Sequence, residues 1–173
     1  GQLSVALSKV DVITNQANIF KSAKEWAIPA LVGKMDLPKS FVEKYEKEFG
    51  EIYESLPQQV IHRDPNPGNI IICGENWGVL DFDLSERNIR IFDPCYAATA
   101  ILSESFEADN TDKLMQWIII YKNIMYGYNE VVKLSNNEWK AIPYVVIANQ
   151  LIATAWFSEQ EKYRELYETN RKM

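Results

Sequence analysis

The sequence has too few metal-binding side chains for a zinc site. It contains one histidine and two cysteines, Cys73 and Cys95, with no C-x-x-C pair among its 173 residues. A structural zinc ion needs four cysteine or histidine ligands at short spacings. Both cysteines stand in or beside apolar segments, so we expect reduced, packed thiols in a cytoplasmic protein.

Basic side chains are also fewer than acidic ones. Eighteen lysines and arginines are outnumbered by 24 aspartates and glutamates, which gives a net charge of −6. Binding to nucleic acid or to an anionic membrane surface needs a basic patch against the phosphates. We therefore predict neither partner, whereas a cationic substrate is compatible with this charge.

Long hydrophobic runs and a signal peptide are also missing. The apolar run at residues 117–120 is typical of the longest, far short of the roughly 20 residues that span a bilayer. No basic start followed by a continuous apolar stretch marks a signal peptide. A hydrophobic content of 47% over this length fits one domain with a sizeable core, so we predict a single domain over residues 1–173.

The side chains that can carry out chemistry are concentrated in residues 60–83, VIHRDPNPGNIIICGENWGVLDFD. This stretch contains the pattern H-x-D-x-x-x-x-N from residue 62, followed by D-F-D from residue 81. The Asp64 carboxylate can accept the proton of an attacking hydroxyl. The Asn69 carboxamide oxygen and the Asp81 carboxylate can hold Mg²⁺ against phosphate groups. The spacing therefore predicts metal-assisted phosphoryl transfer.

Each of these residues also has an ordinary interpretation when it is taken alone. A single histidine beside a strand, such as His62, is more often a core residue, and Asp64 can bond the backbone of a turn. Asn69 can cap a strand and Asp81 can end a hairpin. The combination at these spacings favours catalysis. For Asp83, a metal contact, a substrate contact and a structural hydrogen bond remain equal alternatives.

The flanking residues predict a rigid frame around the motif. Pro65 and Pro67 exclude helix and strand from the loop itself. A hairpin after the loop would return the chain so that Asp64 and Asp81 face one metal ion. The predicted elements are a short strand at 59–61, strands at 70–73 and 77–80, and a turn at 74–76.

Apolar residues at helical spacing predict that most of the remaining chain is helix. Asp93 is interpreted as an N-cap with Pro94 at the first helical position. Ser135-x-x-Glu138 is a capping box, and Pro143 is expected to bend the helix that follows. The further expectations are one or two helices over 3–24, a helix end and loop over 24–33, a helix from an Asp36 N-cap to about 56, a polar loop over 84–90, a helix over 112–133 opened by Asn110 or Thr111, and a solvated helix end over 159–172.

HRDPNPGN followed by VLDFD resembles the catalytic loop and metal-binding aspartate of the aminoglycoside phosphotransferase and choline kinase superfamily, small-molecule kinases with a protein-kinase-like fold. The ending Pro67-Gly68-Asn69 matches this superfamily better than protein kinases. D-F-D replaces the D-F-G of protein kinases, and no A-P-E follows. Two departures occur: Arg63 stands where the family usually has glycine, and Pro65-Asn66 replaces the common Leu-His.

The resemblance implies a mostly helical α+β fold, the C-terminal lobe of a kinase-like fold with a small β-hairpin that carries the catalytic loop. The N-terminal lobe that binds ATP is expected to be absent from these residues and to be their partner. The implied roles are catalysis by Asp64, metal binding by Asn69 and Asp81 with Asp83 as a metal or substrate contact, and support of the loop by His62 and Asp93. Mg²⁺ and ATP are the implied cofactor and co-substrate.

The acceptor implied by the resemblance is a hydroxyl of a small molecule, and aminoglycoside, choline, ethanolamine, homoserine and sugar all stay open. A kinase-like module that binds a partner without catalysis is the alternative from another class. A protein kinase fragment is disfavoured by the Pro-Gly-Asn ending and the missing A-P-E. The oligomeric state is not defined by the sequence.

Several aromatic residues at helical spacing have two interpretations. They form core, which is the commoner case, or they wall a substrate pocket that can hold an ammonium group by cation–π attraction. These residues are Trp117, Tyr121, Tyr128, Trp139, Tyr144 and Trp156.

Overall fold

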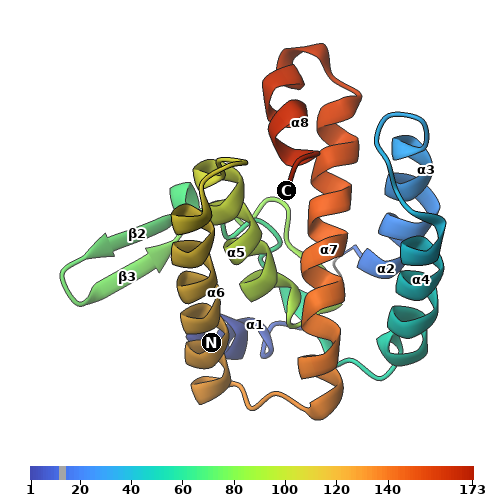
Figure 1. Ribbon diagram of the computed structural model, residues 1–173. Coiled ribbons are helices and arrows are strands. Elements are labelled where there is room, and N and C mark those ends of the chain that lie inside the picture. The colour runs from blue at the N-terminus through green and yellow to red at the C-terminus, as the bar shows by residue number, and fades with distance from the viewer. Residues whose placement is uncertain (12–14) are drawn as a thin grey trace.

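A computed structural model describes residues 1–11 and 15–173 of the chain, and helices make up most of it (Figure 1). The predicted Val12 and Ile13 positions of the first helical segment lie outside the described residues. The helices are α1 Gln2–Leu7, α2 Ile19–Ser22, a π-helical turn Ala23–Ala27, α3 Ile28–Leu31, α4 Lys39–Tyr53, α5 Phe92–Ser105, α6 Thr111–Val131, α7 Asn136–Ser158 and α8 Arg164–Asn170. The strands are β1 Gln58–Ile61, β2 Ile70–Cys73, β3 Asn76–Val79 and β4 Glu86–Ile89.

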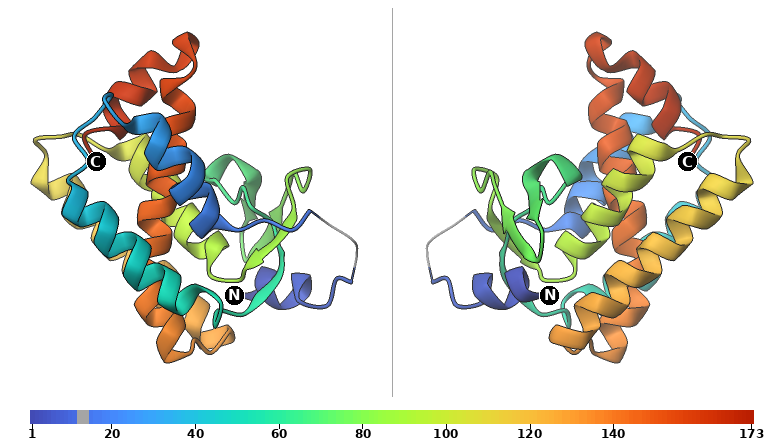
Figure 2. Two further views of the ribbon diagram at one scale, coloured as in Figure 1. Left: turned by 90° about the vertical axis from the view of Figure 1, so that its right-hand side faces the viewer. Right: turned by 90° about the vertical axis from the view of Figure 1, so that its left-hand side faces the viewer.

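Helix α7 is the centre of the core. It lies between the α5–α6 pair on one side and α2, α3 and α4 on the other, with α8 packed near its C-terminal end (Figures 1 and 2). Small and branched side chains let its neighbours approach closely, and the fully buried ones are Ala141, Val145, Ala148 and Ala155. Among the described residues, α7 is also the helix whose length and composition would suffice to cross a membrane, with 44% of that stretch buried inside this fold. Helices at the centre of folded domains pass the same test.

Aromatic side chains join α4 to its neighbours. Phe49 of α4 stacks on Tyr144 of α7 with ring centroids 5.6 Å apart, and Phe20 of α2 meets Phe49 edge to face at 5.5 Å. Tyr45 and Tyr53, one turn before and after Phe49, are also buried. This face of α4 therefore packs into the core, where aromatic rings contribute both buried area and favourable edge-to-face geometry.

A buried ion pair joins the start of α7 to the loop after β4. The Arg90 guanidinium makes two hydrogen bonds to the Glu138 carboxylate. Its Nε–H donates to one oxygen at 2.6 Å, and a terminal N–H donates to the other at 2.8 Å. Glu138 has no exposed surface, and it also closes the capping box with Ser135 that the sequence predicted. Burial opposes ionisation here, but hydrogen bonds from Arg90 and Ser135 hold the pKa of Glu138 below its ordinary value. The pair thus fixes where α7 begins relative to the β1–β4 sheet.

The prediction of a polar loop at 84–90 is wrong. Residues 86–89 form β4, which pairs antiparallel with β1 in the register Gln58↔Ile89 and Ile61↔Glu86. The sequence E-R-N-I has no alternation of apolar and polar residues, so it carries no strand signal. Glu86 and Asn88 are nevertheless buried, because they hydrogen-bond to each other at 3.1 Å.

Three predicted helix boundaries are also wrong. Residues 19–31 are continuously helical through the π-helical turn, instead of ending in a loop after Lys24, and Pro29 lies directly after that turn, at the start of α3. Helix α4 begins at Lys39 after Pro38, so Asp36 is not its N-cap. Asp93 lies inside α5 and caps nothing on its own helix, since its carboxylate bonds the chain elsewhere.

The prediction for the C-terminal tail is also corrected. Instead of a frayed end of α7, residues 164–170 form the separate helix α8, which folds back on α7. The Gln150 carboxamide of α7 donates to the Asn170 backbone carbonyl at 3.0 Å, and Asn170 is buried. Polar contacts of this kind leave no hydrophobic period in the sequence.

The local predictions from turn and cap residues are confirmed. Strand β2 has the predicted bounds, β3 begins one residue early, and Gly74 takes a left-handed φ of +61° in the turn between them. The Asn110 side chain caps α6 by accepting the Lys113 N–H at 3.1 Å. Pro143 lies within α7, as expected. Cys95 is buried, but Cys73 is exposed on the hairpin, which contradicts the expected packing of that thiol.

Replacing Glu138 with glutamine should destabilise the fold by about 3 kcal/mol at neutral pH, because Arg90 would lose its buried counter-charge. The folded-state pKa of Glu138 is lowered, so its stabilisation is present above the ordinary glutamate value of 4.5 and is lost as the pH falls through the lower folded value. Urea unfolding at several pH values should therefore show the difference between wild type and variant shrinking in acid. Glu43→Gln, at an exposed pair with Lys39, is the control and should unfold like wild type.

Candidate active site

The imidazole of His62 connects the two halves of the predicted motif. The side chain is fully buried; its Nδ1 accepts the Asp64 backbone N–H at 3.2 Å, and its Nε2 donates to the Leu80 carbonyl at 2.8 Å. An N–H can only donate and a carbonyl can only accept, so both ring nitrogens are assigned and the ring is neutral with its proton on Nε2. The ring thereby holds the residue before Asp81 and the backbone of Asp64 at a fixed separation.

The Asp93 carboxylate holds the backbone of the same loop. Its two carboxylate oxygens accept the backbone N–H groups of His62 and Arg63, each at 2.9 Å. Burial raises the pKa of Asp93, against the effect of these two hydrogen bonds. The predicted N-cap is thus replaced by a contact across the fold, and this is the loop contact that the family resemblance implied.

The Asp64 carboxylate is positioned by two carboxamides. One oxygen accepts from Asn66 Nδ2 at 2.9 Å and the other from Asn69 Nδ2 at 3.2 Å. Asn69 Nδ2 also donates to the Asp64 backbone carbonyl at 2.9 Å. Burial, and then the neighbouring Asp64 carboxylate, raise the pKa of the Tyr96 phenol of α5. The carboxylate is half-buried and has a fixed direction, as a group that receives a proton from a bound hydroxyl requires.

The hairpin brings Asn69 next to the residue before Asp81. The Leu80 N–H donates to the Asn69 carbonyl at 2.9 Å, which extends the β2–β3 ladder by one pair beyond Ile70↔Val79. Because Asn69 Nδ2 is engaged by Asp64, its Oδ1 is the atom left to meet a cation, and it has no hydrogen bond among the described residues. Asp81 follows directly, exposed and with a left-handed φ of +61°.

The oxygen donors here suit a magnesium ion that is shared with a substrate phosphate. Over residues 1–11 and 15–173, no three histidine, cysteine, aspartate or glutamate side chains gather as a protein-only metal site. Mg²⁺ is commonly held by one or two protein oxygens, with water and substrate phosphates completing its shell. The Asn69 carboxamide oxygen and the Asp81 carboxylate are donors of that kind. Asp83 is exposed in the turn that follows and makes no side-chain hydrogen bond within the described part of the chain.

A family model described as the phosphotransferase enzyme family matches residues 18–117, more than half of the chain. The chain belongs to the phosphotransferase enzyme family. The match contains every residue of the predicted site, from His62 to Asp93, and confirms the family resemblance seen in the motif. No curated protein matches the chain.

The phosphotransferase has a cleft of about 490 Å³ beside Asp64. Five aromatic side chains are among the residues that line it, and of the six aromatic residues considered from the sequence only Trp156 is one of them, within the described part of the chain. Tyr144 stacks in the core instead, and Trp117 donates its indole N–H to the Ala98 carbonyl at 2.7 Å. The sequence analysis did not foresee this cleft, whose lining comes from separated segments of the chain and includes Trp26, Arg63, Glu86, Phe92, Tyr96, Asn149 and Phe157.

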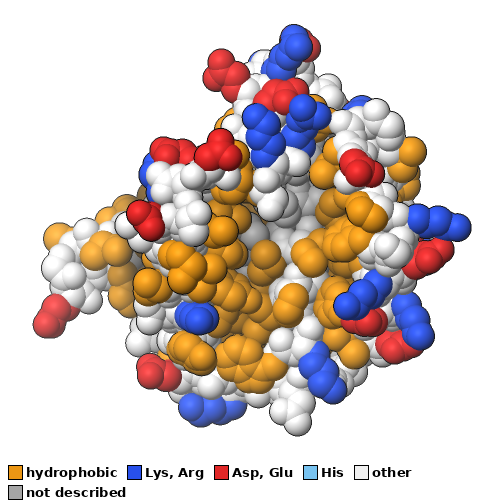
Figure 3. All heavy atoms as spheres, viewed as in Figure 1, with side chains coloured by type: hydrophobic (Ala, Val, Ile, Leu, Met, Phe, Trp, Pro, Cys, Tyr) orange, Lys and Arg blue, Asp and Glu red, His pale blue; other side chains and the backbone are white. Residues whose placement is uncertain are grey.

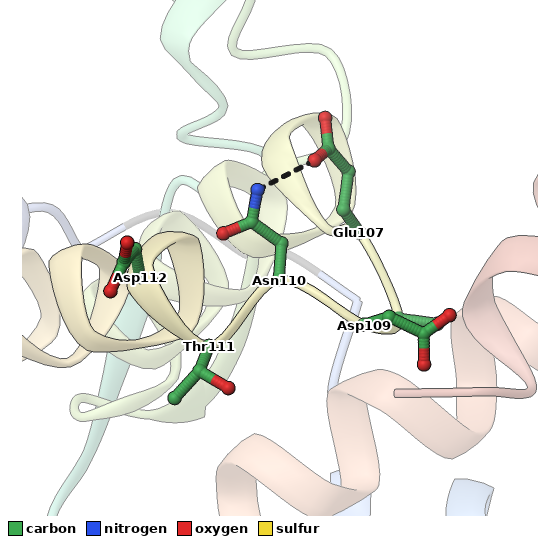
Figure 4. Close-up of a pocket in the computed structure, with 6 residues that line it drawn as sticks. Glu107, Asp109, Asn110, Thr111 and Asp112 are labelled. Carbon is green, nitrogen blue, oxygen red and sulfur yellow. Dashed lines mark hydrogen bonds between the residues drawn. The ribbon is translucent and has the colours of Figure 1, made fainter.

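A second hollow lies at the loop between α5 and α6 (Figure 4). It is shallow and open, and its side chains come from one continuous segment, residues 107–112. The Asn110 carboxamide turns toward Glu107 and donates to it at 2.8 Å, while its oxygen caps α6. Its polar groups thus belong to a helix start, and none of the phosphotransferase motif residues lies in it.

We expect Asp93→Asn to lower the free energy of unfolding by about 1–3 kcal/mol, because an amide can accept only one of the two loop N–H groups through its oxygen and leaves the other facing an NH₂ group. Chemical denaturation of both proteins measures the difference. Asp109→Asn, at an exposed loop position, is the matched control. Equal stability of all three proteins would mean that Asp93 does not hold the loop.

Proposed function

We propose that this chain is the C-terminal, catalytic and substrate-binding lobe of a kinase that uses ATP and Mg²⁺ to phosphorylate a hydroxyl of a small molecule. The observation that carries the proposal is the Asp64 carboxylate, fixed by two carboxamides at the edge of a cleft. Membership of the phosphotransferase family supports the reaction class.

Asp64 acts on the acceptor. A hydroxyl bound in the cleft donates to the carboxylate and loses its proton to it as the new O–P bond forms and the bond to the leaving phosphate breaks. His62 cannot take this role, because both ring nitrogens are already engaged with the backbone. It positions Asp64 and the Asp81 segment instead, and catalysis in this reaction depends chiefly on such positioning.

Asn69 and Asp81 act on the donor nucleotide. Their oxygens would hold Mg²⁺, which when bound neutralises charge on the phosphates. The hydrogen bond from Asn69 Nδ2 to Asp64 ties the two functions together, since one carboxamide orients the base and presents its oxygen to the cation. Asp83 is proposed as a second contact to the metal or the substrate, and its exposure supports either.

The surface around the hairpin supports the role of a lobe that needs a partner. Strands β2 and β3 project from the helices (Figure 1), and hydrophobic atoms follow the projection in the space-filling view (Figure 3). Ile72 is 76% exposed and Trp77 50% exposed, and Leu80 and Phe82 beyond them are also exposed. Several exposed large apolar side chains on and beside one hairpin favour an interface. An N-terminal lobe of the same protein, with the adenine ring between the lobes, would cover it.

In the complete enzyme, Asp64→Asn should lower kcat at least about tenfold with little change in thermal stability, because the amide keeps the shape of the carboxylate but cannot accept the proton. A coupled assay of ADP release with Mg-ATP and a panel of hydroxyl acceptors measures the rate. Asp109→Asn, in the α5–α6 loop, should turn over like wild type. Near-normal turnover of the Asp64 variant would remove the proposed base.

The 173-residue chain alone should bind ATP weakly or undetectably and should not turn over, because it supplies only one side of the nucleotide site. Isothermal calorimetry with Mg-ATP and the same assay test this. Robust kinase activity from these residues alone would contradict the lobe assignment.

A further inference from the structure

Helix α6 is apolar on two faces, and the fold covers one of them. On the inner face, which packs against α5, Met125 and Tyr128 are buried. The outer face carries Met115, Ile119 and Tyr126, which are 52%, 58% and 61% exposed. Hydrophobic atoms accordingly cover much of the surface over α6 (Figure 3). A helix that is apolar all round is normally buried on every side, so the outer face of α6 is suited to a second contact.

The outer face of α6 is a single stripe with a charge of each sign. Its residues follow one another in alternating steps of three and four, the spacing of a coiled-coil seam, and this α6 stripe consists of Asp112, Met115, Ile119, Lys122 and Tyr126. Asp112 and Lys122 are exposed, and neither forms an ion pair with another residue that the structure describes. The two charges stand on either side of Met115 and Ile119, where a partner helix would meet both.

The order of these side chains is complementary to itself when two copies of α6 run antiparallel. In a pair whose two-fold axis passes between Met115 and Ile119, each Met115 lies opposite the Ile119 of the other copy. The same register sets each Asp112 opposite a Lys122, and the two-fold axis makes both contacts twice. A parallel pair would set Asp112 against Asp112, and an antiparallel pair centred on the whole helix would set it against Glu130. Both of these alternatives bring like charges together.

We propose that the α6 stripe is a homodimer interface, in which α6 of one copy packs antiparallel against α6 of a second copy. The inference goes beyond the proposed function and does not depend on it. Within the described residues, the Asp64 cleft is lined by elements other than α6, so dimerisation uses a separate surface. A contact built on one helix pair is small beside the roughly 800 Å² per partner of a standard interface, and we therefore expect reversible association.

Sedimentation velocity of the complete protein tests the interface. Over roughly 1–200 μM the wild type should shift from monomer to dimer. Ile119→Asp should stay monomeric over the same range, because it places a charge in the middle of the apolar contact. Circular dichroism should show the variant folded, since this side chain is exposed. A wild type that is monomeric at the highest concentration, or a dimer that persists in Ile119→Asp, would overturn the proposal.

Charge reversal tests the antiparallel register. Asp112→Lys sets two lysines against each other at both ends of the contact, and Lys122→Asp does the same with two aspartates. Each single variant should raise the Kd of the dimer about tenfold, and the double variant should restore it to within about threefold of wild type. Lys44→Asp, at an exposed position of α4, is the matched control and should dimerise like wild type. Single variants that dimerise normally, or a double variant that is not restored, would contradict the pairing.

The outcomes also identify another occupant of the stripe. If a different segment of the complete protein covers it, the wild type is monomeric throughout and Ile119→Asp lowers its Tm, and this result would overturn the dimer. The ADP assay is separate from these measurements. A protein that dimerises through α6 but transfers no phosphate keeps the interface and loses the kinase assignment, whereas a monomeric kinase keeps that assignment and loses the interface.

Discussion

The hydrogen bonds of the His62 segment are the constraint on which the site depends. Its ring joins the Asp64 backbone to the Leu80 carbonyl, and Asp93 holds the backbone N–H groups of His62 and Arg63. The His62 and Asp93 side chains are buried, and in such surroundings unpaired polar groups are costly and complete networks are correspondingly rigid. These hydrogen bonds therefore hold the loop that carries Asp64 and the strand end that delivers Asp81 in a common position.

A buried ion pair places the central helix beside this network. The Arg90–Glu138 pair fixes the beginning of α7, and α7 in turn presents Asn149 and Trp156 to the cleft. Buried ion pairs contribute less to stability than their Coulomb attraction suggests, because both charges lose their hydration. This pair instead fixes the position of α7 along its axis, because Glu138 must meet Arg90 and close the Ser135 capping box at the same time.

Local rules of protein structure are obeyed through most of the molecule and broken beside Asp64. Arg63 takes a glycine-like backbone conformation, and Asn149 keeps a buried donor without a partner. Departures from local consistency are expected where function imposes its own geometry. Both residues line the cleft that contains Asp64.

The sequence by itself determined the features that depend on neighbouring residues. The motif residues, the β2–β3 hairpin, the Asn110 cap and the Ser135 capping box follow from turn and cap chemistry within a few positions, and the motif was enough to identify the family. Tertiary structure alone decided the pairing of β1 with β4, the use of Asp93 across the fold, and the assembly of the cleft from distant segments. The physical reason is that these contacts bury polar groups by pairing them over about 30 residues or more, as His62 and Asp93 do. Such pairing leaves no period in the sequence, because burial there is set by the partner and not by the hydrophobicity of the segment itself.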